Sequence, residues 1–145
     1  MQFFARDVIA DNANFTAKDP TGYLFAIISS SMFLAWQRAV GGTLESRLRF
    51  SATVVWNNLP LPEVSDAARE KIIAAGHAVL DARALHPARS LADHYNPLAM
   101  SSTLIKAHDA LDRAVDKAFG ARKKPETIQE RQEILFKRYA ELTGA

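Results

Sequence analysis

Residues 41–62 read GGTLESRLRFSATVVWNNLPLP, and polar and apolar side chains alternate along this stretch. The apolar side chains share one parity: Leu48, Phe50, Ala52, Val54 and Trp56. A period of two is typical of a β-strand with one face on the core and the other in solvent. Gly41 and Gly42 permit a preceding helix to end, and Pro60 and Pro62 cannot donate to a sheet. The sequence therefore predicts one strand with both ends defined.

The polar face of this predicted strand carries Arg47 and Arg49, with Glu45 in the same row. Arginine can donate two hydrogen bonds to guanine in the major groove, and a carboxylate can accept one from cytosine. Each such pair discriminates between bases by about 1–3 kcal/mol. Alternating charges are also ordinary on the solvated face of a half-buried strand. The pattern alone favours that plainer interpretation and leaves base readout open.

A helix is expected before the strand. Asp19 and Pro20 are typical of a helix start, because a carboxylate can cap the first turn and proline fits it. Apolar residues then recur every three or four positions, at Leu24, Ile27, Ile28, Met32, Ala35, Trp36, Ala39 and Val40. We expect one amphipathic helix that packs under the apolar face of the strand. Ser29–Ser31 fall in its middle, where small residues allow close packing and no neighbouring base indicates a nucleophile.

The sequence after Pro62 becomes alanine-rich and helical, so we predict a domain boundary near residues 62–64. Helices are expected from Asp66 to about His86, over one turn at residues 90–95, and from Ser102 to Gly120. Thr127 and Glu130 have capping-box spacing and predict a last helix. The expected fold class is mostly α with a small β component. A helix-plus-strand part spans residues 1–62, and a C-terminal helical bundle spans residues 63–145.

The composition is that of an ordinary globular protein. The chain has 145 residues, of which 48% are hydrophobic and 23% are charged, with a formal net charge of +2. This charge is too small to indicate a nucleic-acid partner by itself. Cysteine is absent, which excludes disulfides, thiolate zinc sites and a thiol nucleophile. No signal peptide or membrane-length apolar segment is visible, so we expect a soluble cytoplasmic protein.

The sequence shows no motif that is typical of a catalytic site or of a metal-binding site. The four histidines, His77, His86, His94 and His108, form no i, i+4 pair and no HExxH frame. His108 lies on an apolar stripe, where a core histidine bonded to a nearby carboxylate is expected.

The charged residues of the helix expected from Ser102 to Gly120 also have a plain interpretation. Asp109, Asp112 and Asp116 alternate with Arg113 and Lys117, which predicts a solvated, salt-bridged helix face. No glycine-rich phosphate loop is present.

Three ordered segments carry a resemblance to a known family. Residues 29–63, SSSMFLAWQRAVGGTLESRLRFSATVVWNNLPLPE, resemble the end of the target-recognition domain of MmeI-like type IIG restriction and modification enzymes. The segments SLADHYNPLAM and LIKAHDALDRAVDKAFG resemble the C-terminal helical region of that family. The resemblance covers most of residues 21–120. One departure is Thr43, where the family often has a basic residue after the two glycines.

The resemblance implies which residues contact DNA. The base-contacting set would be Glu45, Arg47 and Arg49, which the family uses to choose base pairs. The candidates for contacts with the DNA backbone are Arg38, Ser51, Thr53, Arg122, Lys123 and Lys124. The chain would then read base edges from one strand and grip phosphates.

The resemblance also implies a parent enzyme, an adenine-N6 DNA methyltransferase that uses S-adenosylmethionine. The methyltransferase fold and the nuclease lie upstream in that family. We therefore expect no catalytic centre and no cofactor in this chain, and S-adenosylmethionine in the parent enzyme. The expected partners are double-stranded DNA and the methyltransferase domain of the parent enzyme.

Two other classes of function are compatible with the chain. A homodimeric helical interaction module would show no salt-dependent DNA binding, whereas DNA recognition requires it. A small hydrolase is disfavoured because no set of nucleophile, base and orienting group is visible. If residues 1–62 are only the closing part of a larger recognition domain, one strand on one helix would leave aromatic side chains exposed, which predicts self-association, most simply as a twofold dimer. The aromatics expected to be exposed are Phe3, Phe4, Phe25, Phe33 and Trp36.

Overall fold

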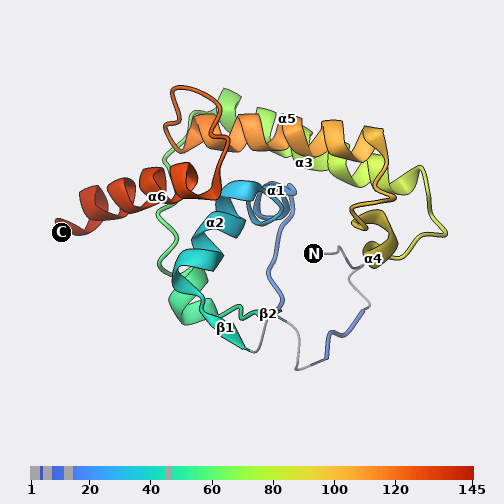
Figure 1. Cartoon of the computed structure of the whole chain (residues 1–145), viewed down its shortest axis with the longest axis horizontal. Coiled ribbons are helices and arrows are strands. Elements are labelled where there is room, and N and C mark those ends of the chain that lie inside the picture. The colour runs from blue at the N-terminus through green and yellow to red at the C-terminus, as the bar shows by residue number, and fades with distance from the viewer. Residues whose placement is uncertain (1–3, 5–7, 12–14, 45–46) are drawn as a thin grey trace.

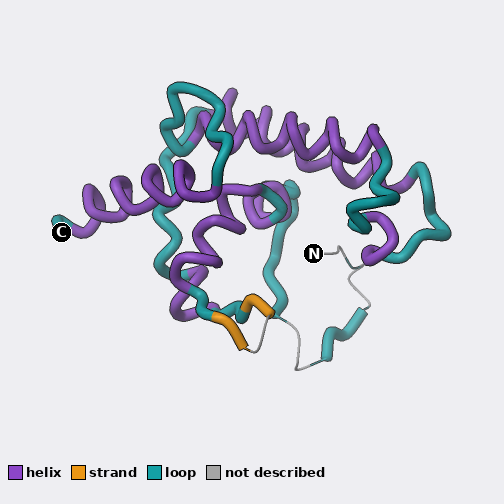
Figure 2. The backbone as a smooth tube through the Cα atoms, in the orientation of Figure 1, coloured by secondary structure: helices purple, strands orange, loops and turns teal. Residues whose placement is uncertain are grey.

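The computed structural model describes residues 4, 8–11, 15–44 and 47–145. These residues form six α-helices, a two-stranded hairpin and one π-helical turn (Figures 1 and 2). The elements in chain order are α1 (Tyr23–Ile28), α2 (Ser31–Val40), β1 (Thr43–Leu44), β2 (Arg47–Leu48), η1 (Ala52–Trp56), α3 (Asp66–Ala84), α4 (Leu91–His94), α5 (Ser102–Ala118) and α6 (Ile128–Thr143). The expected fold class, mostly α with a small β component, is confirmed, although the β component is confined to the hairpin.

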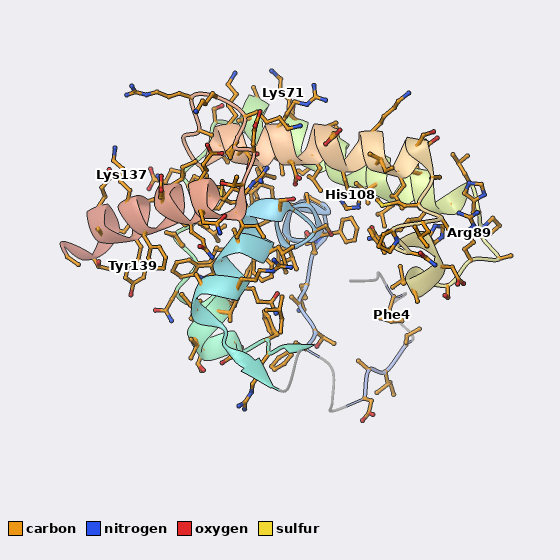
Figure 3. The ribbon with its side chains drawn as sticks, in the orientation of Figure 1. Phe4, Lys71, Arg89, His108, Lys137 and Tyr139 are labelled. Carbon is orange, nitrogen blue, oxygen red and sulfur yellow. The ribbon has the colours of Figure 1, made fainter. Side chains whose placement is uncertain are left out.

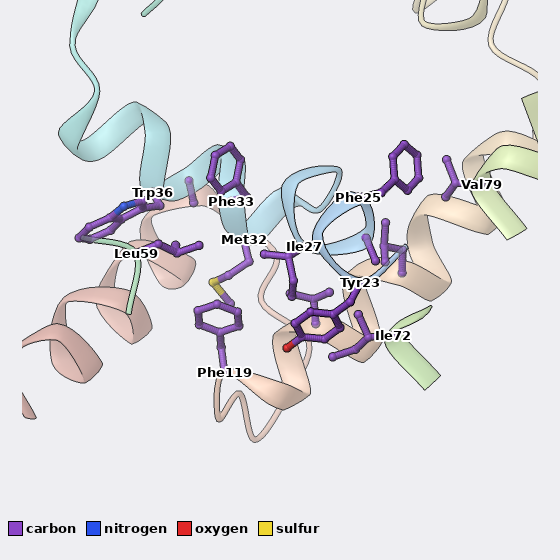
Figure 4. Packing of buried hydrophobic residues seen from close by; sticks show 14 of the residues in the cluster. Tyr23, Phe25, Ile27, Met32, Phe33, Trp36, Leu59, Ile72, Val79 and Phe119 are labelled. Atoms are coloured by element: carbon purple, nitrogen blue, oxygen red, sulfur yellow. The ribbon is translucent and has the colours of Figure 1, made fainter. Parts of the chain in front are cut away.

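The two long helices α3 and α5 lie side by side and run in opposite directions (Figure 1). Helix α1 packs against α3, and α2 packs against α6. A Cβ added to Gly76 of α3 would lie 2.7 Å from the Cβ of Ala26, so α1 and α3 touch at that point. The core is one cluster that contains Phe25, Ile27 and Met32 from the first helices and Ile72, Val79 and Phe119 from the later ones (Figure 4).

The single helix predicted before the strand is wrong, because the chain breaks at Ser29 and Ser30 into α1 and α2. Ser30 has extended backbone angles, and its side chain accepts from the N–H of Phe33 at 3.3 Å, so it caps α2. Serine at such a position competes with helix continuation, since its hydroxyl offers the backbone another partner. The carboxylate of Asp19 binds the start of α1 as expected, since it accepts from Gly22 at 3.0 Å and Phe25 at 2.8 Å. The predicted helix start at Asp19 and Pro20 is wrong, however, because α1 begins at Tyr23, after Gly22.

The single strand predicted from Gly41 to Pro62 is also wrong. Strands β1 and β2 pair antiparallel, with Thr43 opposite Leu48 and Leu44 opposite Arg47. Ser51 then caps the π-helical turn η1, which replaces the rest of the expected strand. Val54, expected to face the core, is 47% exposed, whereas Val55 is fully buried. Phe50 is half-buried and packs against the core as predicted.

The helices of the C-terminal half form as predicted, with small shifts at their starts. The capping residues are Ser65 and Ser101, each one position before the expected Asp66 and Ser102. Thr127 and Glu130 form the predicted capping box of α6. Within the described part of the chain, no helix is long and apolar enough to cross a membrane.

The predicted solvated face on α5 is wrong for Asp116, which is buried, and for Asp112, which binds a residue of α2, whereas the side chain of Asp109 is still 47% exposed. Asp116 is 2% exposed and accepts two hydrogen bonds from Arg131 of α6, at 2.9 and 2.8 Å. Burial raises the pKa of Asp116, while the hydrogen bonds and charge of Arg131 act in the opposite direction. Asp112 bonds to Ser31, and Asp109 lies 3.8 Å from the ammonium of Lys124.

The predicted carboxylate partner of His108 is also wrong. Nε2 of His108 lies 2.8 Å from the hydroxyl of Tyr95. The same hydroxyl accepts from Nε of Arg83 at 2.9 Å and from Nη2 of Arg83. Because arginine only donates, the hydroxyl proton goes to His108, which must be neutral to accept it. Burial lowers the pKa of His108, in agreement with this assignment.

The expected exposed aromatic patch does not form as predicted. Phe25, Phe33 and Trp36 are 1%, 4% and 1% exposed, because α1 and α2 are covered by α3, α6 and η1. Phe4 is 62% exposed as expected, and Phe3 lies outside the described residues.

Candidate nucleic-acid interface

The hairpin is attached directly to the end of α2 through a glycine pair. Gly41 caps α2, and Gly42 has a φ of 65°, a left-handed angle that favours glycine. The N–H of Arg49 donates to the carbonyl of Gly42 at 3.3 Å, which extends the hairpin past β2. A Cβ on Gly41 would lie 2.9 Å from the carbonyl oxygen of Arg49. The two glycines therefore let the hairpin fold back closely on the helix end.

The single strand that was predicted to carry the three base-contacting residues does not form. Arg47 lies in β2, and Arg49 follows it with an exposed side chain. Glu45 lies outside the described residues. Because β1 and β2 pair antiparallel, Leu44 and Arg47 lie opposite each other on two strands and not along one continuous strand.

The expected backbone-contacting residues near the hairpin have mixed environments. Arg38, in the last turn of α2, and Thr53, in η1, are exposed. Ser51 is half-buried and has a structural role, because its hydroxyl accepts from the N–H of Val54 at 3.3 Å and lies 3.1 Å from the hydroxyl of Thr53. The side-chain amide of Asn58 donates to the carbonyls of Thr53 at 2.8 Å and Val54 at 3.1 Å. Of these candidates near the hairpin, Arg38 and Thr53 are thus exposed, as is Arg49.

Behind the hairpin, α2, η1 and the segment that follows η1 up to Leu61 form a platform, which aromatic packing supports. The indole N–H of Trp36 donates to the carbonyl of Val55 at 2.8 Å, which fixes η1 to α2. The Trp36 ring centroid lies 5.7 Å from that of Phe136 and 5.8 Å from that of Tyr139, both on α6 (Figure 3 labels Tyr139). Phe50 contacts the ring of Phe15 edge-on, with centroids 4.9 Å apart.

Three side chains of the C-terminal half make polar contacts with this platform that the sequence did not predict. Asp112 accepts from the backbone and hydroxyl of Ser31. Gln132 donates to the carbonyl of Ala35 at 3.1 Å, and Arg138 donates to the carbonyls of Pro60 at 2.9 Å and Leu61 at 3.2 Å. These partners are separated by 77 to 97 positions in the chain, so local spacing gives no signal for them.

The basic segment Arg122–Lys124 lies in the connection between α5 and α6, at the far side of the molecule from the hairpin (Figure 1). All three side chains are exposed. The ammonium of Lys123 lies 4.0 Å from Glu130, and that of Lys124 lies 3.8 Å from Asp109. The structure therefore does not bring this segment together with Arg38, Arg49 and Thr53.

Other site classes find little support in the described part of the chain. No group of three or more histidine or acidic side chains there could hold a metal ion. His86 and His94 approach each other, with ring centroids 6.5 Å apart, but no acidic ligand completes the pair.

Comparison with known proteins gives matches over the whole chain. Residues 1–63 match the family described as the target recognition domain of MmeI, and residues 64–145 match the family described as the MmeI C-terminal domain. DNA methyltransferase A of Bacillus subtilis (strain 168) is 36% identical over 137 residues, which are 94% of this chain and 15% of that protein.

A solved structure shows the same fold. The type IIL restriction-modification enzyme MmeI in complex with DNA aligns with a TM-score of 0.80 and 41% sequence identity. The alignment covers 85% of this chain and 16% of MmeI. The chain thus spans roughly one sixth of the length of these relatives.

Proposed function

The chain belongs to the MmeI family, and from that premise we propose that it is the DNA-recognition and supporting helical part of a restriction-modification DNA methyltransferase. The observation that carries the proposal is the exposed Arg49 at the base of a hairpin that follows α2, a helix with one buried face. The solved relative is a complex with DNA, which supports a DNA partner here.

In this proposal Arg47 and Arg49 donate to base acceptors in the major groove, and Glu45 accepts from a base amino group. Arg38 and Thr53 flank the hairpin and contact phosphates, which position the protein on the duplex without reading sequence. Ser51 contributes by holding Thr53 and the first turn of η1. Arg122, Lys123 and Lys124 would add a separate phosphate contact.

The division of the chain follows the same proposal. A partial target-recognition region over residues 1–62 reads DNA, and the helical domain over residues 63–145 supports it. The separate family matches on either side of residue 63 support this division. The methyltransferase domain of the parent enzyme would bind S-adenosylmethionine and carry out the chemistry, and a cytoplasmic location would follow from action on DNA.

A homodimeric helical module without DNA binding is the alternative. The dimer was predicted from exposed aromatic side chains, but three of these, Phe25, Phe33 and Trp36, are buried. Phe4, Ile9 and Phe15 are still exposed, and they could pair in a second copy. Light scattering over a range of concentrations would detect such a dimer.

The deciding experiment is selection from a pool of randomised DNA duplexes at low salt, followed by binding measurements at increasing salt. We expect the chain to enrich a short motif and to lose affinity as salt rises. Arg49→Ala should relax discrimination at one base position, since one bidentate pair is worth about 1–3 kcal/mol. Lys106→Ala on the exposed face of α5 is a control and should leave the motif unchanged. No enrichment and no salt dependence would favour the interaction module.

A further inference from the structure

The first turn of α2 receives its carboxylate from another helix. Asp112 of α5 accepts from the N–H of Ser31 at 2.8 Å and from its hydroxyl at 2.5 Å. The first turn of α2 contains no acidic residue of its own. A helix N-terminus has unpaired N–H groups and a partial positive charge, both of which favour a carboxylate. Asp112 therefore completes this helix end from the C-terminal half.

The C-terminal half contacts the same platform at two further points. Gln132 binds the carbonyl of Ala35 in α2, and Arg138 binds the carbonyls of Pro60 and Leu61 after η1. Trp36 joins α2 to η1 through the carbonyl of Val55. Helix α2, the hairpin and η1 are thus held as one unit whose direction is set from α5 and α6.

The position of Asp112 at one end of α2 affects the hairpin at the other end. The 10 residues of α2 span about 15 Å at a rise of about 1.5 Å per residue. A tilt of about 10° about the midpoint of such a helix would move its end by about 1 Å, more than a precise binding site tolerates. Only Gly42 separates the C-cap Gly41 from β1, so the hairpin would move with the helix end.

We propose that Asp112 is a positioning residue for DNA readout, which fixes the direction of α2 and thereby the placement of Arg47 and Arg49. This inference rests on the proposed DNA-recognition function. It gives the helical half a part in orienting the hairpin that is independent of any phosphate contact by Arg122–Lys124.

The first test measures amide hydrogen exchange in the free chain, without DNA. Asp112→Ala removes both acceptors, and Asp112→Asn retains one oxygen without the charge. Asp109→Asn is the matched control, because Asp109 lies on the same helix and contacts Lys124. We expect exchange at Arg49, relative to core amides of Leu111 and Leu135, to accelerate roughly fivefold in Asp112→Ala, the factor expected for loss of a helix cap. Asp112→Asn should give a smaller effect, and Asp109→Asn should give none.

The second test measures binding to the duplex that the unsubstituted chain selects from a randomised pool. Asp112→Ala should bind this duplex roughly fivefold more weakly and prefer the same sequence, while Asp109→Asn should stay within about twofold. Failure of the unsubstituted chain to select any duplex would contradict the proposed function. Unchanged exchange at Arg49, or acceleration confined to the core amides, would instead overturn the positioning role of Asp112. Unchanged affinity of Asp112→Ala would overturn it as well.

Discussion

The guanidinium of Arg131 binds both carboxylate oxygens of Asp116, at 2.9 and 2.8 Å, where the two side chains are only 8% and 3% exposed. This pair links α6 to α5. Each buried charge is stabilised by the other, because a lone buried charge would have neither solvent nor a counter-ion.

Removing one partner of this pair should therefore be strongly destabilising. We expect Arg131→Met to lower the free energy of unfolding by about 3–5 kcal/mol, since it leaves Asp116 buried without a partner. The double variant Arg131→Met, Asp116→Leu should recover much of that loss. Lys123→Ala, which removes an exposed ion pair, is the control and should change stability by less than about 1 kcal/mol. Urea denaturation measures all three, and a double variant less stable than the single one would contradict the argument.

Stability should fall as the pH drops below the ordinary pKa of histidine. His108 accepts the Tyr95 hydroxyl proton only when neutral, and burial lowers its pKa, with Arg83 acting in the same direction and Asp112 and Asp109 opposing. The unfolded chain then binds a proton more readily than the folded chain does. The contribution of His108 is complete above a pH of about 6.5 and is lost as the pH falls through the lowered folded value.

Glutamine can accept the same hydroxyl proton without titrating, so His108→Gln isolates this effect from the other histidines. Thermal unfolding of both proteins from about pH 8 to about pH 5 provides the measurement. The original protein should lose more stability than the variant over this range. Parallel profiles would show that His108 does not contribute.

Whether Gly76→Ala stabilises or destabilises the protein tests how tightly α1 packs against α3. In an open helix, alanine in place of glycine stabilises by roughly 0.5–1 kcal/mol. Here the new methyl group would lie 2.7 Å from the Cβ of Ala26, so we expect a loss of about 1–3 kcal/mol instead. Ala26→Gly in the same chain should relieve the overlap and restore part of the loss. Chemical denaturation that shows a gain in the single variant would indicate that the helices can separate without cost.

The basic segment between α5 and α6 can be tested by the salt dependence of DNA binding. Neutralising Arg122, Lys123 and Lys124 together should lower the salt slope by about 0.9 for each phosphate contact that they make, with the selected motif unchanged. Lys123 and Lys124 already pair with Glu130 and Asp109, so we expect a reduction closer to one contact than to three. An unchanged slope would assign the segment to solvent, and an altered motif would contradict sequence-independent contact.

The local sequence by itself determined most of the helical framework. Capping residues and apolar periodicity located α3, α5 and α6 to within one residue at their starts, because these signals act over one or two helical turns. The glycine pair located the end of α2, since Gly42 needs a left-handed angle. The resemblance on residues 29–63 and 90–120 indicated the family from the sequence alone.

The tertiary structure decided which partner each polar group takes and which of two local conformations forms. The alternation over residues 48–56 fits a strand, but Ser51 and the indole of Trp36 bind backbone groups of η1 and favour the helical turn. The acids of α5 have the spacing of a solvated face, yet their partners Ser31, Lys124 and Arg131 come from other segments. A pattern along one helix records only which residues share a face. Whether that face meets water or another charged helix depends on contacts between segments that are distant in the chain.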